Sequence, residues 1–324
     1  MSVRITLLGV PSVTRDGAPV VLDTRKAMAL IAHLALGDRP RSREAMCDLL
    51  WPGHDAGRAR GALRRTLSTV RSAIGEQRIG TAADSVALQR GPGLQIDVDR
   101  FRELAAGDSS GELSAAVALF RGAFLEDFAL RDSVEFEDWQ RIQADVLERE
   151  LASALRRLVA ALTVRGNYEP ALAHARRWLA LDALHEPAHR ELIRLLALTG
   201  DRAAALEQYR TCVRTLSLEL GVAPLQETAE LYEQVNDGLL TVAAQPAADA
   251  LRALAAARPQ AELPLVGRDR ELSALVDAHA AAQPDGRLAV IEGEAGIGKT
   301  RLFEELARHA AAAGAVVLST RCHD

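Results

Sequence analysis

The fold is decided by residues 57–74, which read GRARGALRRTLSTVRSAI. On a helix that turns about 100° per residue, Leu63, Leu67, Val70 and Ile74 fall on one narrow apolar stripe. The opposite face carries arginine and small hydroxylated residues, and no acidic residue occurs between positions 55 and 76. This pattern predicts an amphipathic helix that packs on a core through the stripe and turns a basic face outward.

The segments around this helix follow the order of a winged helix-turn-helix domain. Turn signals at residues 14–17 and 90–93 separate stretches that read as strands, and Gly37 and Gly75 stand where helices should stop. In chain order we expect strands at 3–10 and 18–23, a helix capped by Thr24, a short helix begun by Ser42, a loop at 51–55, the helix of 57–74, and strand-like residues at 78–98.

The outward face of the third helix has the chemistry of a helix that lies in a DNA major groove. Arginine hydrogen-bonds guanine through two atoms, Ser and Thr adapt to several base edges, and flanking arginines neutralise phosphates. The alternative is a basic face that is only solvated; the absence of acids and the order of the elements favour DNA. The candidate DNA-binding residues of the helix are Arg58, Arg60, Arg64, Arg65, Ser68, Thr69, Arg71 and Ser72. Weaker candidates are Arg90, expected at a hairpin tip and facing a minor groove or the backbone, and Arg25 and Lys26, expected to meet phosphate near a helix start.

The charge is distributed unevenly along the chain. Residues 1–98 hold 14 basic and 9 acidic residues, a net of +5, whereas the remainder holds 25 and 35, a net of −10. A basic first domain on an acidic chain indicates that this domain meets a polyanion. The three cysteines, Cys47, Cys212 and Cys322, are far apart and lack CxxC spacing, which argues against a disulfide framework or a zinc site. With no long apolar stretch either, we expect a cytoplasmic, nucleoid-associated protein.

Residues 101–238 read as almost entirely helical and contain a repeat. The stretch Gly166–Leu172 recurs 34 residues later as Gly200–Leu206, with alanines at matching positions. This is the spacing of tetratricopeptide repeats, in which helix pairs stack on one another; a generic helical bundle is the alternative. His174, His185 and His189 lack a metal-ligand arrangement and are expected to be ordinary polar residues. The expected helices are 114–125, 134–164, 169–181, 187–199, 202–218 and 225–239.

A phosphate-binding loop follows a linker at residues 241–263. Residues 293–300 read GEAGIGKT after an apolar strand at 288–292, and this matches G-x-x-x-x-G-K-[ST]. In such a loop, Gly293, Gly296 and Gly298 let backbone N–H groups surround phosphate, Lys299 reaches the β- and γ-phosphates, and Thr300 holds Mg²⁺. The sequence ends 24 residues after Thr300, past a second strand at 315–319 and before any further acid for Mg²⁺. We therefore expect a fragment of a nucleotide-binding domain and no enzyme activity from this chain.

These observations predict a mainly α chain of four parts. Residues 1–98 form an α+β winged-helix DNA-binding domain, and 99–240 form a helical, tetratricopeptide-like domain. Residues 241–263 are a linker, and 264–324 begin an α/β P-loop NTPase domain.

The order of the parts resembles the Streptomyces antibiotic regulatory proteins, particularly the large members that carry an ATPase domain. The N-terminal part is similar to the OmpR-type winged helix, and residues from Phe124 onward look like the family's bacterial transcriptional activation domain. The resemblance rests on LLG at 7–9, RKAMAL at 25–30, LLWP at 49–52, ALRRTLS at 62–68, IDVDRF at 96–101, FL at 124–125, AALEQYR at 204–210 and LELG at 218–221.

The resemblance implies a transcriptional activator of a specialised-metabolite gene cluster. Family members bind direct repeats in promoter DNA, side by side, and recruit the RNA polymerase holoenzyme, its sigma factor and core subunits. The loop at 51–56 is then a candidate polymerase contact. DNA binding needs no cofactor in this reading, and ATP with Mg²⁺ is expected only for a longer protein. Two other hypotheses remain open: a signal-transducing ATPase, and a repeat scaffold for protein partners, with DNA binding secondary in either.

Overall fold

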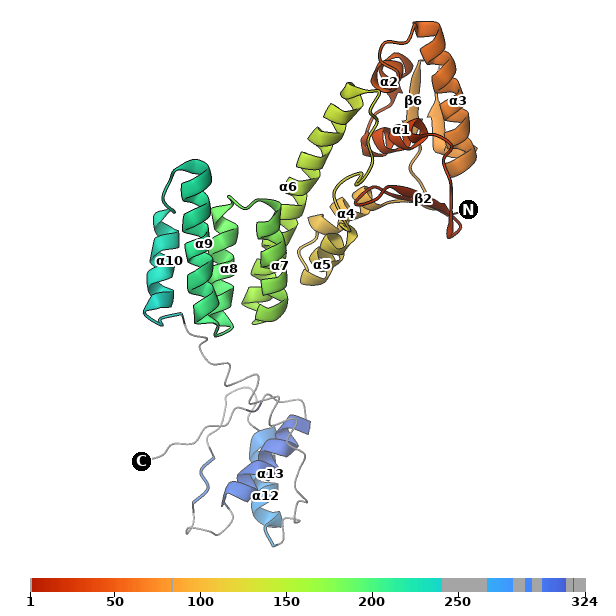
Figure 1. Ribbon diagram of the computed structural model, residues 1–324. Helices are drawn as coiled ribbons and strands as arrows, with labels where there is room; N and C mark the ends of the chain where they lie inside the picture. Colours follow the sequence, from red (N-terminus) through yellow and green to blue (C-terminus); the bar gives the residue numbers. More distant parts are fainter. Residues whose placement is uncertain are drawn as a thin grey trace. The chain divides into compact units, whose positions relative to one another are not determined.

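The computed structural model divides the chain into two compact units, Met1–Ala244 and Gln245–Asp324. It describes residues 2–82, 84–240, 267–281, 289–292, 299–312 and 317. The expected linker at 241–263 lies outside the described residues, as does Cys322. Below, residues 2–96 are called the head and residues 97–240 the helical domain; both belong to the first unit (Figure 1).

Two small sheets frame the head. In the first, β1 (Val3–Thr6) lies between β2 (Ser12–Arg15), which is antiparallel to it, and β7 (Leu94–Ile96), which is parallel, and β3 (Ala18–Pro19) forms the outer edge. In the second, β6 (Ser85–Leu88) pairs with β4 (Arg41–Ser42) and β5 (Ile79–Thr81). The strands expected at 3–10 and 18–23 are therefore shorter than predicted. The first ends at Thr6 because the backbone of residues 7–9 pairs with the helical domain instead.

Three helices complete the head, and their starts agree with the capping residues expected from the sequence. The Thr24 side chain accepts a hydrogen bond from the Ala27 N–H at the start of α1 (Arg25–Leu36), and Ser42 does the same for α2 (Arg43–Leu50). The third helix, α3 (Ala56–Ile74), is followed by a single 3-10 turn, η1 (Glu76–Arg78), that leads into the second sheet. This is the predicted winged helix-turn-helix order.

The helical domain consists of seven helices among the described residues. They are α4 (Asp97–Ala106), α5 (Ser110–Leu119), α6 (Val134–Val164), α7 (Tyr168–Leu181), α8 (Glu186–Leu198), α9 (Arg202–Leu220) and α10 (Gln226–Asn236). The helix expected at 114–125 is wrong at both ends. It begins at Ser110 because Ser109 and Glu112 form a capping box, and it ends at Leu119, before a non-helical segment that runs to Ser133.

The repeated stretch adopts the same local structure in both copies. Gly166 and Gly200 both have positive φ, 73° and 87°, and each is followed by the N-cap residue of a helix, α7 or α9. Ala171 and Ala205, at matching places in these helices, are both fully buried. Their small side chains allow neighbouring helices to approach closely, as the repeat predicts.

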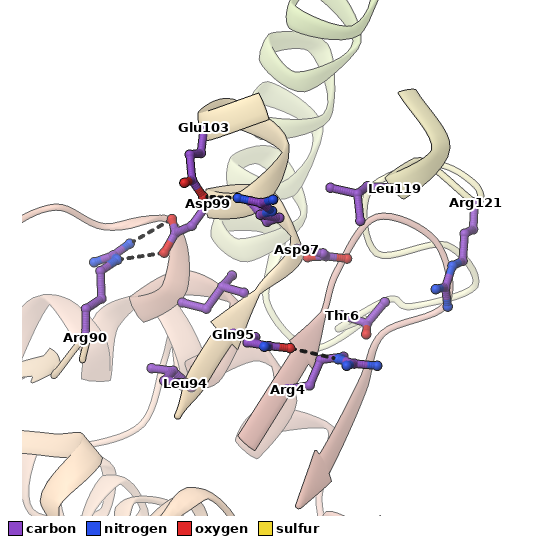
Figure 2. A pocket seen from close by; sticks show the side chains of 12 residues that line it. Arg4, Thr6, Arg90, Leu94, Gln95, Asp97, Asp99, Glu103, Leu119 and Arg121 are labelled. Carbon is purple, nitrogen blue, oxygen red and sulfur yellow. Dashed lines mark hydrogen bonds and ion pairs between the residues drawn. The ribbon is translucent and has the colours of Figure 1, made fainter. Parts of the chain in front are cut away.

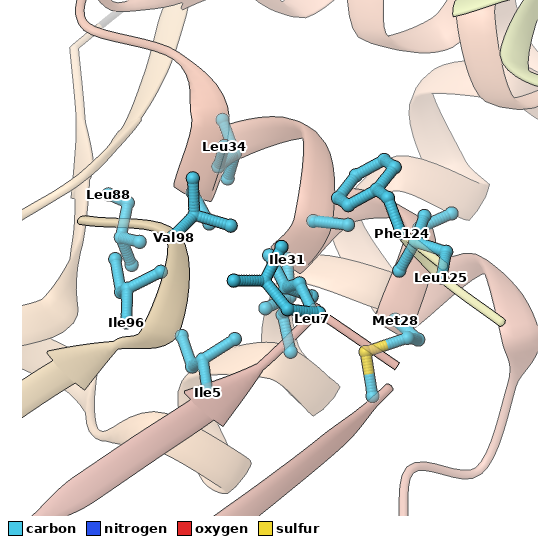
Figure 3. Close-up of a cluster of buried hydrophobic side chains, with 14 of the residues drawn as sticks. Ile5, Leu7, Met28, Ile31, Leu34, Leu88, Ile96, Val98, Phe124 and Leu125 are labelled. Carbon is cyan, nitrogen blue, oxygen red and sulfur yellow. The ribbon is translucent and has the colours of Figure 1, made fainter. Parts of the chain in front are cut away.

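One hydrophobic core runs through the head and into the helical domain. Its buried members extend from Val3 in β1 to Ala188 in α8. Figure 3 shows Phe124 and Leu125, from the segment after α5, beside Leu7 and Ile31 of the head. The expected boundary between residues 98 and 99 falls inside α4, and the core continues across it.

Backbone hydrogen bonds reinforce this junction. The N–H of Leu125 donates to the Leu7 carbonyl at 2.9 Å, the N–H of Gly9 donates to the Ala123 carbonyl at 3.0 Å, and the N–H of Glu126 donates to the Gly9 carbonyl at 3.1 Å. Residues 121–126 therefore act as an extra strand-like edge for the head. The long helix α6 also contacts α2, and α4 contacts β1 and β7, so several elements of the helical domain meet the head (Figure 1).

In the second unit the described residues form two helices that pack against each other, α12 (Asp269–Ala280) and α13 (Lys299–Ala312). Residues 289–292, expected to lie in a strand, adopt no strand structure. The second strand, expected at 315–319, lies outside the described residues apart from Val317.

Candidate nucleic-acid interface

Helix α3 is fixed on the core by one face. The predicted stripe is buried: Leu63, Leu67, Val70 and Ile74 are each 2% exposed or less. The Asp55 carboxylate accepts the Arg58 N–H at 2.9 Å and begins the helix, and the Gly75 N–H donates to the Arg71 carbonyl at 2.8 Å and ends it. Gly75 has φ +104°, a conformation that favours glycine. Both ends and one face are thus held, so the opposite face points in a fixed direction.

The outward face of α3 carries the charge expected from the sequence. The exposed candidate residues are Arg58, Arg60, Arg64, Arg65, Ser68 and Ser72, whereas Thr69 and Arg71 are half-buried. Arg58 forms an ion pair with Asp55 at 3.2 Å. Within the described residues, the side chains of Arg60, Arg64 and Arg65 have no hydrogen bond or ion pair. Three adjacent guanidinium groups without protein partners are suited to bind an anion.

The loop before α3 is anchored from both sides. Trp51 is 6% exposed and its ring lies 5.2 Å from the Lys26 ammonium, so it anchors the loop to α1. The Ser133 hydroxyl, at the N-terminus of α6, donates to the Leu49 carbonyl at 2.5 Å. Gly53 and His54 remain exposed at the apex of the loop. The helical domain therefore supports the turn that orients α3.

Arg90 does not lie at a hairpin tip, which corrects the prediction made from its turn signal. In the β5–β6 hairpin, β5 ends at Thr81 and β6 begins at Ser85, whereas Arg90 lies on the connection from β6 to β7. Its guanidinium pairs with Asp99 at 2.8 Å and donates to the Ala35 carbonyl at 2.7 Å, at the end of α1. The hydrogen bond to Asp99 raises the pKa of Arg90. With its donors engaged inside the protein, Arg90 ties the head to α4.

Arg25 and Lys26 both contact the segment between α5 and α6. The Lys26 ammonium pairs with Asp132 at 2.6 Å, and its side chain is 17% exposed. The Arg25 guanidinium lies 5.5 Å from the Phe128 ring centroid and donates to the Asp127 carbonyl at 3.4 Å, but Arg25 is exposed. The charge of Lys26 therefore holds the helical domain, whereas the phosphate contact expected of Arg25 stays a prediction.

Sequence reasoning missed the residue that links the two parts, Asp97. Its carboxylate accepts the N–H groups of Leu7 and Leu8 at 2.7 and 2.9 Å, although 90 and 89 residues separate them in the chain. Burial raises the pKa of Asp97, and these hydrogen bonds oppose that rise. Acidic residues such as Asp97 and Asp99 are typical of the first turn of a helix. No local signal, however, reveals that Asp97 accepts hydrogen bonds from residues 7 and 8, just after β1.

The histidines and cysteines of the described residues form neither a metal-binding group nor a disulfide. His189 is 2% exposed and is held by the Ala183 carbonyl and the Gln208 amide, so it is an interior residue rather than a surface one. Cys47 and Cys212 are buried free thiols, and burial raises the pKa of each. No group of three potential metal ligands occurs where the structure is described. Nor does any described helix have the length and apolar character needed to cross a membrane.

The phosphate-binding loop is only partly described. Gly293, Gly296 and Gly298 lie outside the described residues, whereas Lys299 and Thr300 form the first turn of α13. The helix expected after the phosphate-binding loop is therefore confirmed, and it begins at Lys299.

Comparison with known proteins supports the helical domain and the nucleotide-binding part of this organisation. Residues 96–236 match the bacterial transcriptional activator domain, and residues 264–324 match the AAA ATPase domain. The regulatory protein AfsR of Streptomyces coelicolor is 27% identical over 96% of this chain, which includes the head. The chain is thus similar to the regulators of the Streptomyces antibiotic regulatory protein type.

Other relatives are transcriptional regulators as well. The transcriptional regulatory protein EmbR of Mycobacterium tuberculosis is 29% identical over 71% of the chain. A solved structure of EmbR, in complex with a low-affinity phosphopeptide, superposes with a TM-score of 0.59 at 25% identity and covers 72% of this chain and 65% of that one. The chain spans 33% of the length of AfsR and 62% of that of EmbR.

Proposed function

We propose that this protein is a sequence-specific DNA-binding activator of transcription, with α3 as the helix that reads the major groove. The observation that carries the proposal is the outward face of α3. Arg60, Arg64 and Arg65 have no partner within the described part of the chain and lie on a helix whose other face is buried. A rigid helix with free guanidinium groups and exposed Ser68 and Ser72 matches base and phosphate contacts.

The family resemblance extends this proposal to the targets. We infer that the DNA is promoter DNA with repeated sites, that two copies bind side by side, and that the regulated genes form a specialised-metabolite cluster. The exposed apex of the loop before α3, at Gly53 and His54, is the candidate contact for RNA polymerase. Such a protein acts on the nucleoid in the cytoplasm.

DNA binding is tested with the full chain by fluorescence anisotropy on promoter DNA of the neighbouring gene cluster and on a scrambled duplex, at two salt concentrations. Arg65→Ala should weaken promoter binding by about 1–3 kcal/mol and relax specificity, because it removes a base contact. Arg64→Ala should weaken binding to both duplexes alike and lower the salt slope by about one, because it removes a phosphate contact. Arg176→Ala, in an exposed arginine of α7, is the matched control and should bind like the wild type.

Two results count against the proposal. One is equal loss of affinity in the Arg65→Ala and Arg176→Ala variants, since that would deny α3 a special role. The other is equal binding of the wild type to promoter and scrambled DNA that vanishes at the higher salt, since that would leave only non-specific attraction.

Polymerase recruitment is tested separately by transcription in vitro with the RNA polymerase holoenzyme. His54→Ala should lose activation at DNA concentrations that saturate binding; its DNA affinity is measured in parallel, because His54 lies at the exposed apex beside Arg58 and Arg65. Unchanged activation by this variant removes the loop from the proposed contact while leaving DNA binding intact.

A second function, nucleotide binding, is favoured by the AAA ATPase match and by the helix that begins at Lys299. In this proposal Lys299 holds the phosphates of ATP and Thr300 a Mg²⁺ ion, which together supply a ligand-dependent switch. Titration of the chain with a fluorescent ATP analogue tests it: Lys299→Ala should abolish binding, and equal binding by the variant would refute the assignment.

A further inference from the structure

A cavity of about 620 Å³ lies where the first sheet meets the start of the helical domain (Figure 2). Its walls come from β1, β7, the first turns of α4 and the residues around the end of α5. No residue of α3 lines it. The volume falls within the range of small-molecule binding sites, about 300–1,000 Å³.

The acidic groups of the cavity wall are already engaged. Asp97 accepts backbone N–H groups at the end of β1, Asp99 pairs with Arg90 at 2.8 Å, and Glu103 pairs with Arg100 at 2.7 Å. Figure 2 shows the Asp99 and Glu103 pairs on one side of the cavity, toward α4. Asp99 and Glu103 are thus each balanced by an arginine, whereas Asp97 keeps a negative charge that is bound by neutral N–H groups.

Two arginines of the cavity lack a carboxylate partner. The Arg4 Nε donates only to the neutral Gln95 Oε1, at 3.2 Å, and Arg121 makes no side-chain hydrogen bond or ion pair with a described residue. The backbone of Arg121 is bound to the end of β1, since its N–H donates to the Leu8 carbonyl at 3.2 Å. Thr6 is two residues from Arg4 in β1, so both side chains lie on the same face of the strand.

We propose that this cavity binds a small organic or inorganic dianion, with Arg4, Arg121 and the Thr6 hydroxyl as its ligands. Guanidinium groups bind phosphate and carboxylate oxygens through parallel charge-assisted hydrogen bonds, and a threonine hydroxyl completes such a site. Because Arg4 belongs to the head and Arg121 to the segment after α5, a bound dianion bridges the two. The proposal goes beyond DNA binding, as it assigns the protein a small-molecule ligand.

The test is calorimetric titration of the full chain that carries Lys299→Ala, which removes the other phosphate-binding candidate. Two probes distinguish the sources of the charge: inorganic phosphate, present as the hydrogen phosphate dianion, and succinate, with acetate as the monoanion control. We expect saturable binding of one dianion and much weaker binding of acetate. In this background Arg4→Gln and Arg121→Gln should each weaken binding about tenfold or more, because each removes a charge-assisted pair. Thr6→Val should weaken it less, and Arg176→Gln should leave it unchanged.

The proposal is overturned if neither dianion binds at about 10 mM, a concentration that would half-saturate even a weak site. It is also overturned if Arg4→Gln and Arg176→Gln bind equally well. A third contrary result is a lower salt slope of DNA binding in the Arg4→Gln or Arg121→Gln variant, with no effect on dianion binding, which would make these arginines DNA phosphate contacts. Arg4 and Arg121 are exposed, and a thermal unfolding curve of each variant verifies that the fold is retained.

Discussion

Replacing Phe124 by alanine tests whether the helical domain completes the core of the DNA-binding head. Phe124 belongs to the segment after α5, yet it is 4% exposed and lies in the same core as β1 and α1 (Figure 3). Its ring also meets the Trp139 ring of α6 edge to face, with 6.0 Å between the centroids. One side chain thus contacts both the head and the long helix.

The expected loss of stability follows from this burial. Truncation of a buried phenylalanine to alanine costs about 3–5 kcal/mol, from lost apolar burial and from the cavity left behind. For a unit of this size, each kcal/mol lowers the unfolding midpoint by about 2–4 °C, so the midpoint should fall by about 6–20 °C. Val164→Ala is the matched control, since Val164 is 89% exposed and should leave the midpoint unchanged.

Thermal unfolding followed by circular dichroism measures the shift, and hydrogen exchange locates it. Because Phe124 supports the head, Phe124→Ala should increase exchange in α1 and β1 as well as in residues 121–126. A midpoint within about 2 °C of the wild type would refute the reasoning. So would increased exchange confined to residues 121–126, because the segment would then be a covering loop and not part of the core of the head.

Three further predictions concern residues with an unusual environment. Burial lowers the pKa of His33 from 6.5 to about 4, so the native state resists a proton that the unfolded chain accepts. The free energy of unfolding should therefore fall by up to about 3 kcal/mol as the pH drops from 6.5 to 4. Urea titrations should show that this loss is absent in His33→Phe. Asp97→Ala strands the N–H groups that now bind its carboxylate and should cost about 2–4 kcal/mol in urea, whereas Asp97→Asn keeps an acceptor and should cost less. Gly75→Ala forces φ +104° on a residue with a Cβ and should cost about 1–3 kcal/mol, whereas Gly111→Ala, in α5 with open space around it, should stabilise the fold by up to about 1 kcal/mol.

The features predicted well from the sequence are those set by local chemistry. Thr24, Ser42 and Gly75 mark helix ends because capping depends on residues within one turn, and the stripe through Leu63 is set by helical periodicity. The repeat at Gly166 and Gly200 is also local, since each copy builds its own turn. All these signals lie within a few residues of the structure that they determine.

The features that sequence reasoning missed depend on partners far along the chain. The strand expected at 3–10 stops early because residues 7–9 pair with 121–126, more than a hundred residues away. The helix expected at 114–125 stops at Leu119 for the same reason, since its continuation is used in that pairing. No periodicity or turn signal encodes a contact of this kind, so both errors arise from one long-range junction.

Partners far along the chain also decide which arginines are available to ligands. Arg157 and Arg177 carry as much charge as any residue of α3, but each donates to backbone carbonyls about fifty to sixty residues away and holds helices together. The turn signal around Arg90 predicted a DNA contact, but its guanidinium binds Asp99 and the Ala35 carbonyl and holds α4 to the end of α1. Counting basic residues therefore locates a basic domain, but only the pairing of each guanidinium shows which arginines are available to a ligand. Arg60, Arg64 and Arg65 on the outward face of α3 and Arg4 beside the cavity all lack a carboxylate partner in the described part of the chain. They are expected to bind different anions, because the first three lie along one helix face whereas Arg4 lines a hollow between the first sheet and α4.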